Sequence, residues 1–133
     1  MRMAKRKNLE KKLFTFMIAG VLAVTSVTTA FAKDGSSSWK IGCFDIDGSN
    51  TVVSTYGKGA TGGSAKPYKN YVVVSIYNKK GKQMSIGNKT AANAKASKTL
   101  LGVNPKRVYS CHGVYDSKNN IVGGRFYGIN TVR

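Results

Sequence analysis

Carboxylates are scarce in this sequence, which has five Asp and Glu against 22 Lys and Arg in 133 residues, for a formal net charge of +17. Histidine is scarcer still, because His112 is the only one. A zinc site needs several histidine, cysteine or carboxylate ligands, and a catalytic triad needs a histidine oriented by an acid. A lone histidine without neighbouring acids supplies neither. We therefore expect no enzyme, no metal site and no cofactor.

Long hydrophobic runs are also absent, with one exception between Leu13 and Val27. A membrane span needs about 20 apolar residues, and this run is shorter. A cationic segment precedes it, and the small-x-small triplet Ala30-Phe31-Ala32 follows it. This order is typical of a secretory signal peptide. The sequence therefore predicts that residues 1–32 are removed and that residues 33–133 form one secreted, extracellular domain.

The predicted mature chain contains no Glu at all. Its 16 Lys and Arg stand against the four acids Asp34, Asp45, Asp47 and Asp116, a balance of about +12 that concerns partners and solubility more than the fold. Thirteen of the bases are Lys, a hydrated point charge, whereas Arg is preferred for bidentate reading of phosphates and bases. We therefore expect an anionic cell-envelope partner (wall precursor, wall polymer or lipid head groups) and no specific nucleic acid. The other interpretation is a solvated surface that keeps a small protein soluble.

Two cysteines, Cys43 and Cys111, lie in the predicted mature chain. In an exported protein an even pair is most simply a disulfide. Closing a loop of this length would stabilise the fold by about 4 kcal/mol. Cys111 precedes His112, but adjacent strand residues point to opposite faces, so a thiol–imidazole pair is not expected. The sequence predicts a Cys43–Cys111 disulfide.

Short alternating segments, rich in β-branched and aromatic residues, predict an all-β fold. The predicted strands are 39–46, 51–56, 71–77, 82–86, 108–115 and 121–129. Residues 33–38 are expected to be a mobile start, Asp47-Gly48 a turn, and 57–64 a flexible loop. Residues 88–101 fit either a short helix capped by Thr90 or an edge strand, and their alternation favours the strand. The fold class is a small antiparallel β-sandwich of six to seven strands.

The segments 71–86 and 108–129 look like an internal repeat with a spacing of 38 residues. Tyr71 then matches Tyr109, and Ile76-Tyr77-Asn78 matches Val114-Tyr115-Asp116. A duplicated hairpin that stacks on its copy would bury both apolar faces. In this register Val73 matches Cys111, which places the cysteine on the face that carries the tyrosines.

Three motifs that resemble reactive or binding sites lack a required part. Asp45 and Asp47 share a strand face, but the calcium-loop pattern that they begin lacks its glycine and its final acid. The glycine-rich stretch 57–64 lacks the Gly-Lys-Ser/Thr ending of a phosphate loop. His112 replaces Val74 in the repeat, so a half-buried structural histidine is expected. A small hydrolase that uses Asp45, Asp47 or His112 is the least favoured hypothesis.

Aromatic residues beside lysines are the best candidates for recognition, since tyrosine and tryptophan pack a ring while keeping a polar atom in water. The candidate binding surface consists of Lys79, Lys80, Lys82, Tyr77, Trp39 and Lys40.

The sequence resembles the lactococcin family, small secreted β-sandwich bacteriocins. The residues that carry the likeness are Trp39, Ser54-Thr55-Tyr56-Gly57, Tyr71-Val72-Val73-Val74, Asn78-Lys79-Lys80-Gly81-Lys82 and Ala94-Lys95-Ala96-Ser97. The resemblance implies a folded toxin that binds the wall precursor lipid II and blocks septum formation in related bacteria. The leading hypothesis is therefore a secreted cationic protein that binds an anionic envelope target, as a bacteriocin that interferes with cell-wall synthesis. The alternative is a non-toxic structural or adhesive component of the producer's own envelope.

Overall fold

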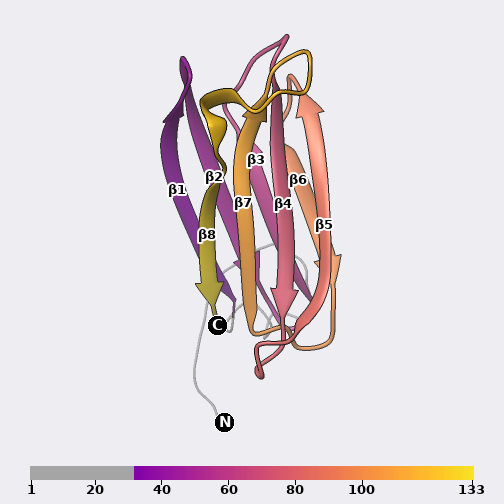
Figure 1. Cartoon of the computed structure of the whole chain (residues 1–133). Coiled ribbons are helices and arrows are strands. Elements are labelled where there is room, and N and C mark those ends of the chain that lie inside the picture. Colours follow the sequence, from indigo (N-terminus) through magenta and orange to yellow (C-terminus); the bar gives the residue numbers. More distant parts are fainter. Residues whose placement is uncertain (1–31) are drawn as a thin grey trace.

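The computed structural model describes residues 32–133, which form two facing antiparallel sheets (Figure 1). The predicted signal peptide lies outside the described residues, apart from Ala32. The strands are β1 (Lys33–Ile41), β2 (Phe44–Val52), β3 (Tyr56–Gly62), β4 (Lys69–Tyr77), β5 (Gln83–Ala92), β6 (Ala96–Leu101), β7 (Arg107–Tyr115) and β8 (Tyr127–Val132). One sheet has the order β1-β2-β3-β6 and the other the order β5-β4-β7-β8. The predicted all-β sandwich is confirmed.

Eight strands form where six or seven were expected, because two segments of small residues are also strands. Residues 33–38, predicted to be mobile, belong to β1 and pair with β2. Most of the glycine-rich stretch 57–64, predicted to be a loop, lies in β3 between β2 and β6. The turn expected at Asp47-Gly48 lies instead at residues 42–43, and Gly48 is inside β2. Residues 88–101 form the end of β5 and all of β6, so the strand interpretation is confirmed against the helix. The alternating residues 92–97 that favoured it nevertheless span the break between the two strands, at residues 93–95.

The core has two apolar clusters between the sheets. The larger consists of Val52, Val72, Val74, Ile76, Ala96, Leu100 and Val108. The smaller consists of Ile41, Ile46 and Val114, with Trp39, Phe44, Tyr68, Val122 and Tyr127 packed against it. Both clusters and both sheets are built from residues 33–133, so this part of the chain contains a complete core. Among the described residues, no helix has the length and apolar character that crossing a membrane requires.

The hairpins β4–β5 and β7–β8 lie side by side in one sheet, so the predicted stacking of one hairpin on its copy is wrong, and the apolar faces of both pack against the other sheet. The return strand expected at 121–129 is also wrong in its bounds, because residues 122–124 form a 3-10 turn and β8 begins only at Tyr127. The strands β4 and β7 lie side by side in the middle of their sheet, and Val73 is directly opposite Cys111. These two residues are also 38 positions apart, so each is the repeat partner of the other. Equivalent ends of the two hairpins therefore point to opposite ends of the sandwich (Figure 1).

The turns of the two hairpins have the same hydrogen bonds. The Asn78 side-chain oxygen accepts a bond of 2.9 Å from the Lys80 backbone N–H. The Asp116 side-chain oxygen accepts a bond of 2.9 Å from the Lys118 backbone N–H. The first residue of each turn is thus an Asn or Asp, and its side chain stabilises the turn by accepting a hydrogen bond from a backbone N–H two residues later. This equivalence supports the repeat inferred from sequence.

The predicted disulfide is wrong, because Cys43 and Cys111 are both unpaired. Cys43 is exposed in the turn between β1 and β2, at one end of the sandwich. Cys111 lies midway along β7 and shares the outer face with Tyr109, while its neighbour His112 faces the core. The second sheet therefore stands between the Cys111 thiol and the strands that carry Cys43. Neither the number of residues between two cysteines nor their even number indicates whether the two side chains lie close enough to form a disulfide.

Candidate functional site

A row of buried polar side chains crosses the interior between the two sheets. We call this row the polar seam; it consists of Asn50, Thr61, Ser110, His112 and Thr131. Asn50 on β2 donates from Nδ2 to the Ser110 hydroxyl and to the Ile129 carbonyl, both at 2.9 Å. Its Oδ1 accepts a bond from the Thr131 hydroxyl at 2.5 Å. One side chain of the first sheet thus binds three residues of the second.

His112 lies at the centre of the polar seam and is fully buried. Its Nε2 is 2.7 Å from the Ser110 hydroxyl and its Nδ1 is 2.7 Å from the Thr61 hydroxyl. Burial lowers the pKa of His112 to about 4, although a hydrogen bond with the Ala60 backbone acts in the opposite direction. The ring is therefore neutral at physiological pH.

The Ser110–His112 contact has the spacing of a nucleophile and its base. Both side chains have no exposed surface, so no substrate reaches the hydroxyl. The predicted structural histidine on the apolar face is confirmed, and it is more deeply buried than expected. Sequence analysis missed Ser110, although its place two residues before His112 on one strand puts both on the same face.

The acids named as candidate reactive groups point away from His112, because they lie on the outer face of the first sheet while His112 lies between the sheets. Asp45 forms an ion pair with Lys40 at 2.7 Å, and this hydrogen-bonded contact raises the pKa of Lys40. Asp47 accepts a bond from the Ser38 hydroxyl at 2.7 Å. The described residues contain no group of three or more potential metal ligands. The structure therefore does not bring Asp45, Asp47 and His112 into one site.

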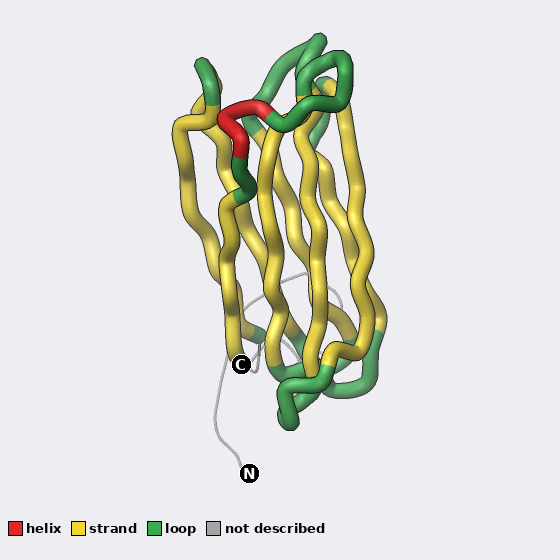
Figure 2. The backbone as a smooth tube through the Cα atoms, in the orientation of Figure 1, coloured by secondary structure: helices red, strands yellow, loops and turns green. Residues whose placement is uncertain are grey.

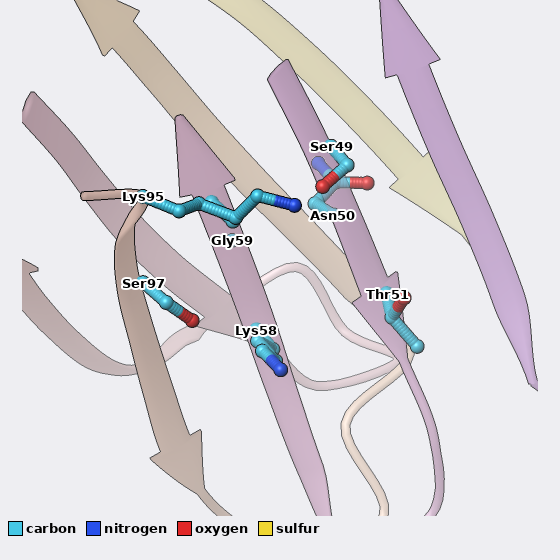
Figure 3. Close-up of a pocket in the computed structure, with 8 residues that line it drawn as sticks. Ser49, Asn50, Thr51, Lys58, Gly59, Lys95 and Ser97 are labelled. Atoms are coloured by element: carbon cyan, nitrogen blue, oxygen red, sulfur yellow. The ribbon is translucent and has the colours of Figure 1, made fainter. Parts of the chain in front are cut away.

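A shallow depression of about 170 Å³ lies on the same outer face. Figure 3 shows the Lys95 side chain extending across β3 towards Ser49 on β2, with Lys58 further along β3. These ammonium and hydroxyl groups are suitable donors for an anion. However, the Thr51 hydroxyl on its rim already donates to Asp34 at 2.6 Å, and Asp47 lines the adjoining hollow. The local charge is therefore balanced, which makes this depression a weak anion site.

The strongest cationic feature is one end of the sandwich, which we call the basic loop end. It consists of residues 53–55, 78–82, 101–107 and 132–133, which lie together in Figures 1 and 2. Six cationic side chains and no Asp or Glu occur in these segments: Lys79, Lys80, Lys82, Lys106, Arg107 and Arg133. Of the four acids of the described residues, Asp45 and Asp116 lie at the opposite end and Asp47 lies midway along β2. Asp34 lies on β1 towards the basic loop end, where it accepts a hydrogen bond from the Thr51 hydroxyl.

Backbone hydrogen bonds join the segments of the basic loop end. The Gly102 N–H donates to the Thr55 carbonyl at 3.0 Å, and the Lys106 N–H donates to the Tyr77 carbonyl at 2.8 Å. The Arg133 N–H in turn donates to the Lys106 carbonyl at 2.9 Å. Four separate pieces of chain are thereby held in one platform.

The cations on this platform differ in how they are engaged. The Arg107 guanidinium lies 3.7 Å from the centre of the Tyr77 ring, a cation–π contact. The Arg133 Nε donates to the Pro105 carbonyl at 2.9 Å, and burial lowers the pKa of Arg133 to about 10, so it stays charged at neutral pH. By contrast, Lys79 and Lys80 are exposed and, within the described residues, their ammonium groups have no bonded partner.

The structure separates the predicted binding surface into two parts. Tyr77, Lys79, Lys80 and Lys82 lie together at the basic loop end. Trp39 and Lys40 lie at the opposite end, on β1 beside its turn into β2. The Trp39 ring faces inwards and stacks on His112 and Tyr127, with ring centres 5.5 and 5.1 Å away, and Lys40 is paired with Asp45. The sequence shows that each aromatic residue is close to a lysine, but it does not show that Trp39 and Tyr77 lie at opposite ends of the sandwich.

Sequence analysis did not identify the loop 102–106 or its neighbour Leu101 as part of this surface. Leu101 and Val103 are strongly exposed there. The sequence did contain an indication of this surface, because the apolar residues just before Asn104-Pro105 and two bases are unusual in a loop. No family model, curated protein or solved structure matches this chain.

Proposed function

We propose that this protein is an exported cationic protein that binds an anionic component of a bacterial cell envelope through its basic loop end. The observation that carries the proposal is the gathering of Lys79, Lys80 and Lys82 in one rigid turn, with no carboxylate side chain in the surrounding segments. Because the turn is already ordered, lysines fixed in this way bind phosphate groups without a further loss of conformational entropy in the backbone. Such attraction is expected to be salt-sensitive, because these charges are exposed.

An antibacterial role extends this proposal. The resemblance of the sequence to the lactococcin family of bacteriocins supports it. We propose that binding interferes with cell-wall synthesis in related bacteria. Inhibition of their growth by the purified protein, together with capture of wall precursors, tests this part.

The binding test uses residues 33–133 and isolated envelopes across a salt series. The variant Lys79→Gln/Lys80→Gln/Lys82→Gln is compared with Lys66→Gln/Lys89→Gln/Lys118→Gln, which loses the same charge at exposed lysines outside the basic loop end. We expect the first variant to lose most of its binding at low salt and the second to retain most of it. Equal losses would show that only total charge matters.

Two further outcomes separate the alternatives. Binding without growth inhibition, with release of the protein from its own cells by moderate salt, would assign a structural or adhesive role instead. A failure of the unaltered protein to bind any envelope fraction at low salt would overturn the proposal.

A further inference from the structure

The basic loop end also carries the most exposed apolar side chains of the described residues. Val103 is 88% exposed, Leu101 80% and Val132 58%, above every other large hydrophobic residue in this part of the chain. A single exposed apolar residue needs no explanation. Here the three highest values occur at one end of the sandwich, beside exposed lysines.

The loop holds Leu101 and Val103 in place instead of letting them fold back onto the core. The residue between them, Gly102, is fixed by its hydrogen bond to the Thr55 carbonyl. The Asn104 N–H donates to the Ser54 carbonyl at 2.8 Å on the other side of Val103. Their side chains are therefore presented to the outside from a fixed backbone, with no ordering cost left for a partner to meet.

We propose that the basic loop end docks on an anionic phospholipid bilayer, with Leu101 and Val103 entering the boundary between head groups and acyl chains. Lys79, Lys80 and Lys82 then contact the lipid phosphates around the inserted side chains. The strands stand end-on to the membrane in this arrangement (Figure 1). This inference rests on the proposed function and names the partner for the same surface.

The apolar side chains favour a bilayer over a wall polymer as the partner. A phosphate-rich polymer attracts lysines but offers leucine and valine no apolar phase. A bilayer offers both, since apolar side chains gain by leaving water and basic ones gain near an anionic surface. The combination of basic and apolar side chains on one surface is the pattern of interfacial membrane binding.

The first test measures sedimentation of residues 33–133 with vesicles of phosphatidylglycerol and phosphatidylcholine, and with vesicles of phosphatidylcholine alone. We expect binding to the anionic vesicles only. Leu101→Ser/Val103→Ser should weaken it at least tenfold, a loss of about 1.4 kcal/mol or more. The control Ile86→Ser removes a side chain that is 57% exposed on β5 and should change binding less than twofold.

The charge contribution has a matched control within the repeat. Lys80 and Lys118 occupy equivalent positions in turns with the same hydrogen bonds, at opposite ends of the sandwich. Lys80→Gln should weaken vesicle binding about fivefold, the value of one lysine near an anionic surface. Lys118→Gln should leave it within twofold. Equal losses from the two variants would overturn the end-on arrangement.

Insertion itself is measured with Val103→Trp and vesicles that contain brominated lipids, which quench tryptophan fluorescence near the acyl chains. The added tryptophan should be quenched, whereas Ile86→Trp should not, and Trp39 supplies the same background in both because it packs inside the opposite end. Binding to isolated wall polymer without vesicle binding would overturn this inference and leave the proposed function standing. Binding to neither would overturn both.

Discussion

His112 Nδ1 and the Thr61 hydroxyl oxygen lie 2.7 Å apart, and this contact joins a central strand of one sheet to β3 of the other through the middle of the core. Together with the bonds of Asn50, it fixes which polar groups of the two sheets must meet. Apolar side chains alone tolerate many packings, whereas a buried donor without its acceptor costs about 1–3 kcal/mol. The polar seam therefore constrains how the two sheets align.

The buried imidazole makes the stability of the fold depend on pH. The pKa of His112 is about 4 in the folded state, against 6.5 for an exposed histidine. Below pH 6.5 the unfolded chain takes up a proton that the folded chain does not, so the free energy of unfolding falls as pH falls towards 4. The expected total loss is roughly 3 kcal/mol.

Urea unfolding of residues 33–133 at pH 7.5, 6 and 5 measures this effect. Hydrogen bonds from the backbone of Asn120 and Lys118 lower the pKa of Asp116, and its stabilising contribution is lost only at the lower pH where carboxylates are protonated. The loss between pH 6.5 and 5 is therefore assigned to His112. A free energy of unfolding that stays constant over this range would contradict the neutral, buried ring.

Removing the Asn50 side chain should be strongly destabilising. Asn50→Ala leaves the buried hydroxyls of Ser110 and Thr131 without this partner, and we expect a loss of about 2–4 kcal/mol. Ser49→Ala, one residue earlier on the exposed face, should change stability by less than about 0.5 kcal/mol. Urea unfolding of both variants tests the assignment, and similar values for the two would refute it.

Gly48 makes room for the aromatic rings beside the polar seam. A Cβ at this position would lie 2.6 Å from the Trp39 ring and 2.9 Å from the His112 ring. We expect Gly48→Ala to lower the free energy of unfolding by about 1–3 kcal/mol through overpacking. At Gly62 the nearest atom would lie 3.6 Å away, on the flexible Lys95 side chain, so Gly62→Ala should be neutral or slightly stabilising. Thermal unfolding of both variants shows whether the loss of stability in Gly48→Ala comes from overpacking at this position or from the replacement of any strand glycine.

The two thiols should contribute little to stability. Because Cys43 and Cys111 are unpaired, Cys43→Ser should leave the melting temperature unchanged, and so should a reductant added to the unaltered protein. A disulfide across this span would be worth about 4 kcal/mol. Alkylation followed by mass spectrometry should find both thiols free, with the exposed Cys43 reacting first. A clear drop in melting temperature on reduction would contradict the structure.

The parts of the fold that were predicted correctly have strong local patterns. Tyr71–Tyr77 and Val108–Tyr115 alternate buried and outward side chains over most of their length. The repeat placed Cys111 on the face that carries the tyrosines, and the burial pattern of β7 confirms that Cys111 shares the outer face with Tyr109. Residues 57–62 were missed because glycine and alanine have low strand propensity. They form β3 because the other sheet occupies the missing space: a Cβ at Gly57 would lie 2.3 Å from Ile76. That reason lies in tertiary packing.

The candidate site was partly predicted for a similar reason. Lys79, Lys80 and Lys82 form one turn, so their closeness follows from the sequence. Their association with Leu101 and Val103 depends on how the chain crosses from β5 in one sheet to β6 in the other. No local pattern in the sequence predicts that crossing, and none predicts that the Trp39 ring faces inwards.

The acids Asp45 and Asp116 partly compensate the cations at the end remote from the lysine turn, whereas the segments of the basic loop end contain no acid, so the domain has an electric dipole along its length. A dipole rotates in the field of a charged surface before any atom touches it. A negatively charged surface would therefore turn the molecule lysine-first as it approaches. Reversing those two charges would be expected to slow productive collisions while leaving every contact of the bound state unaltered.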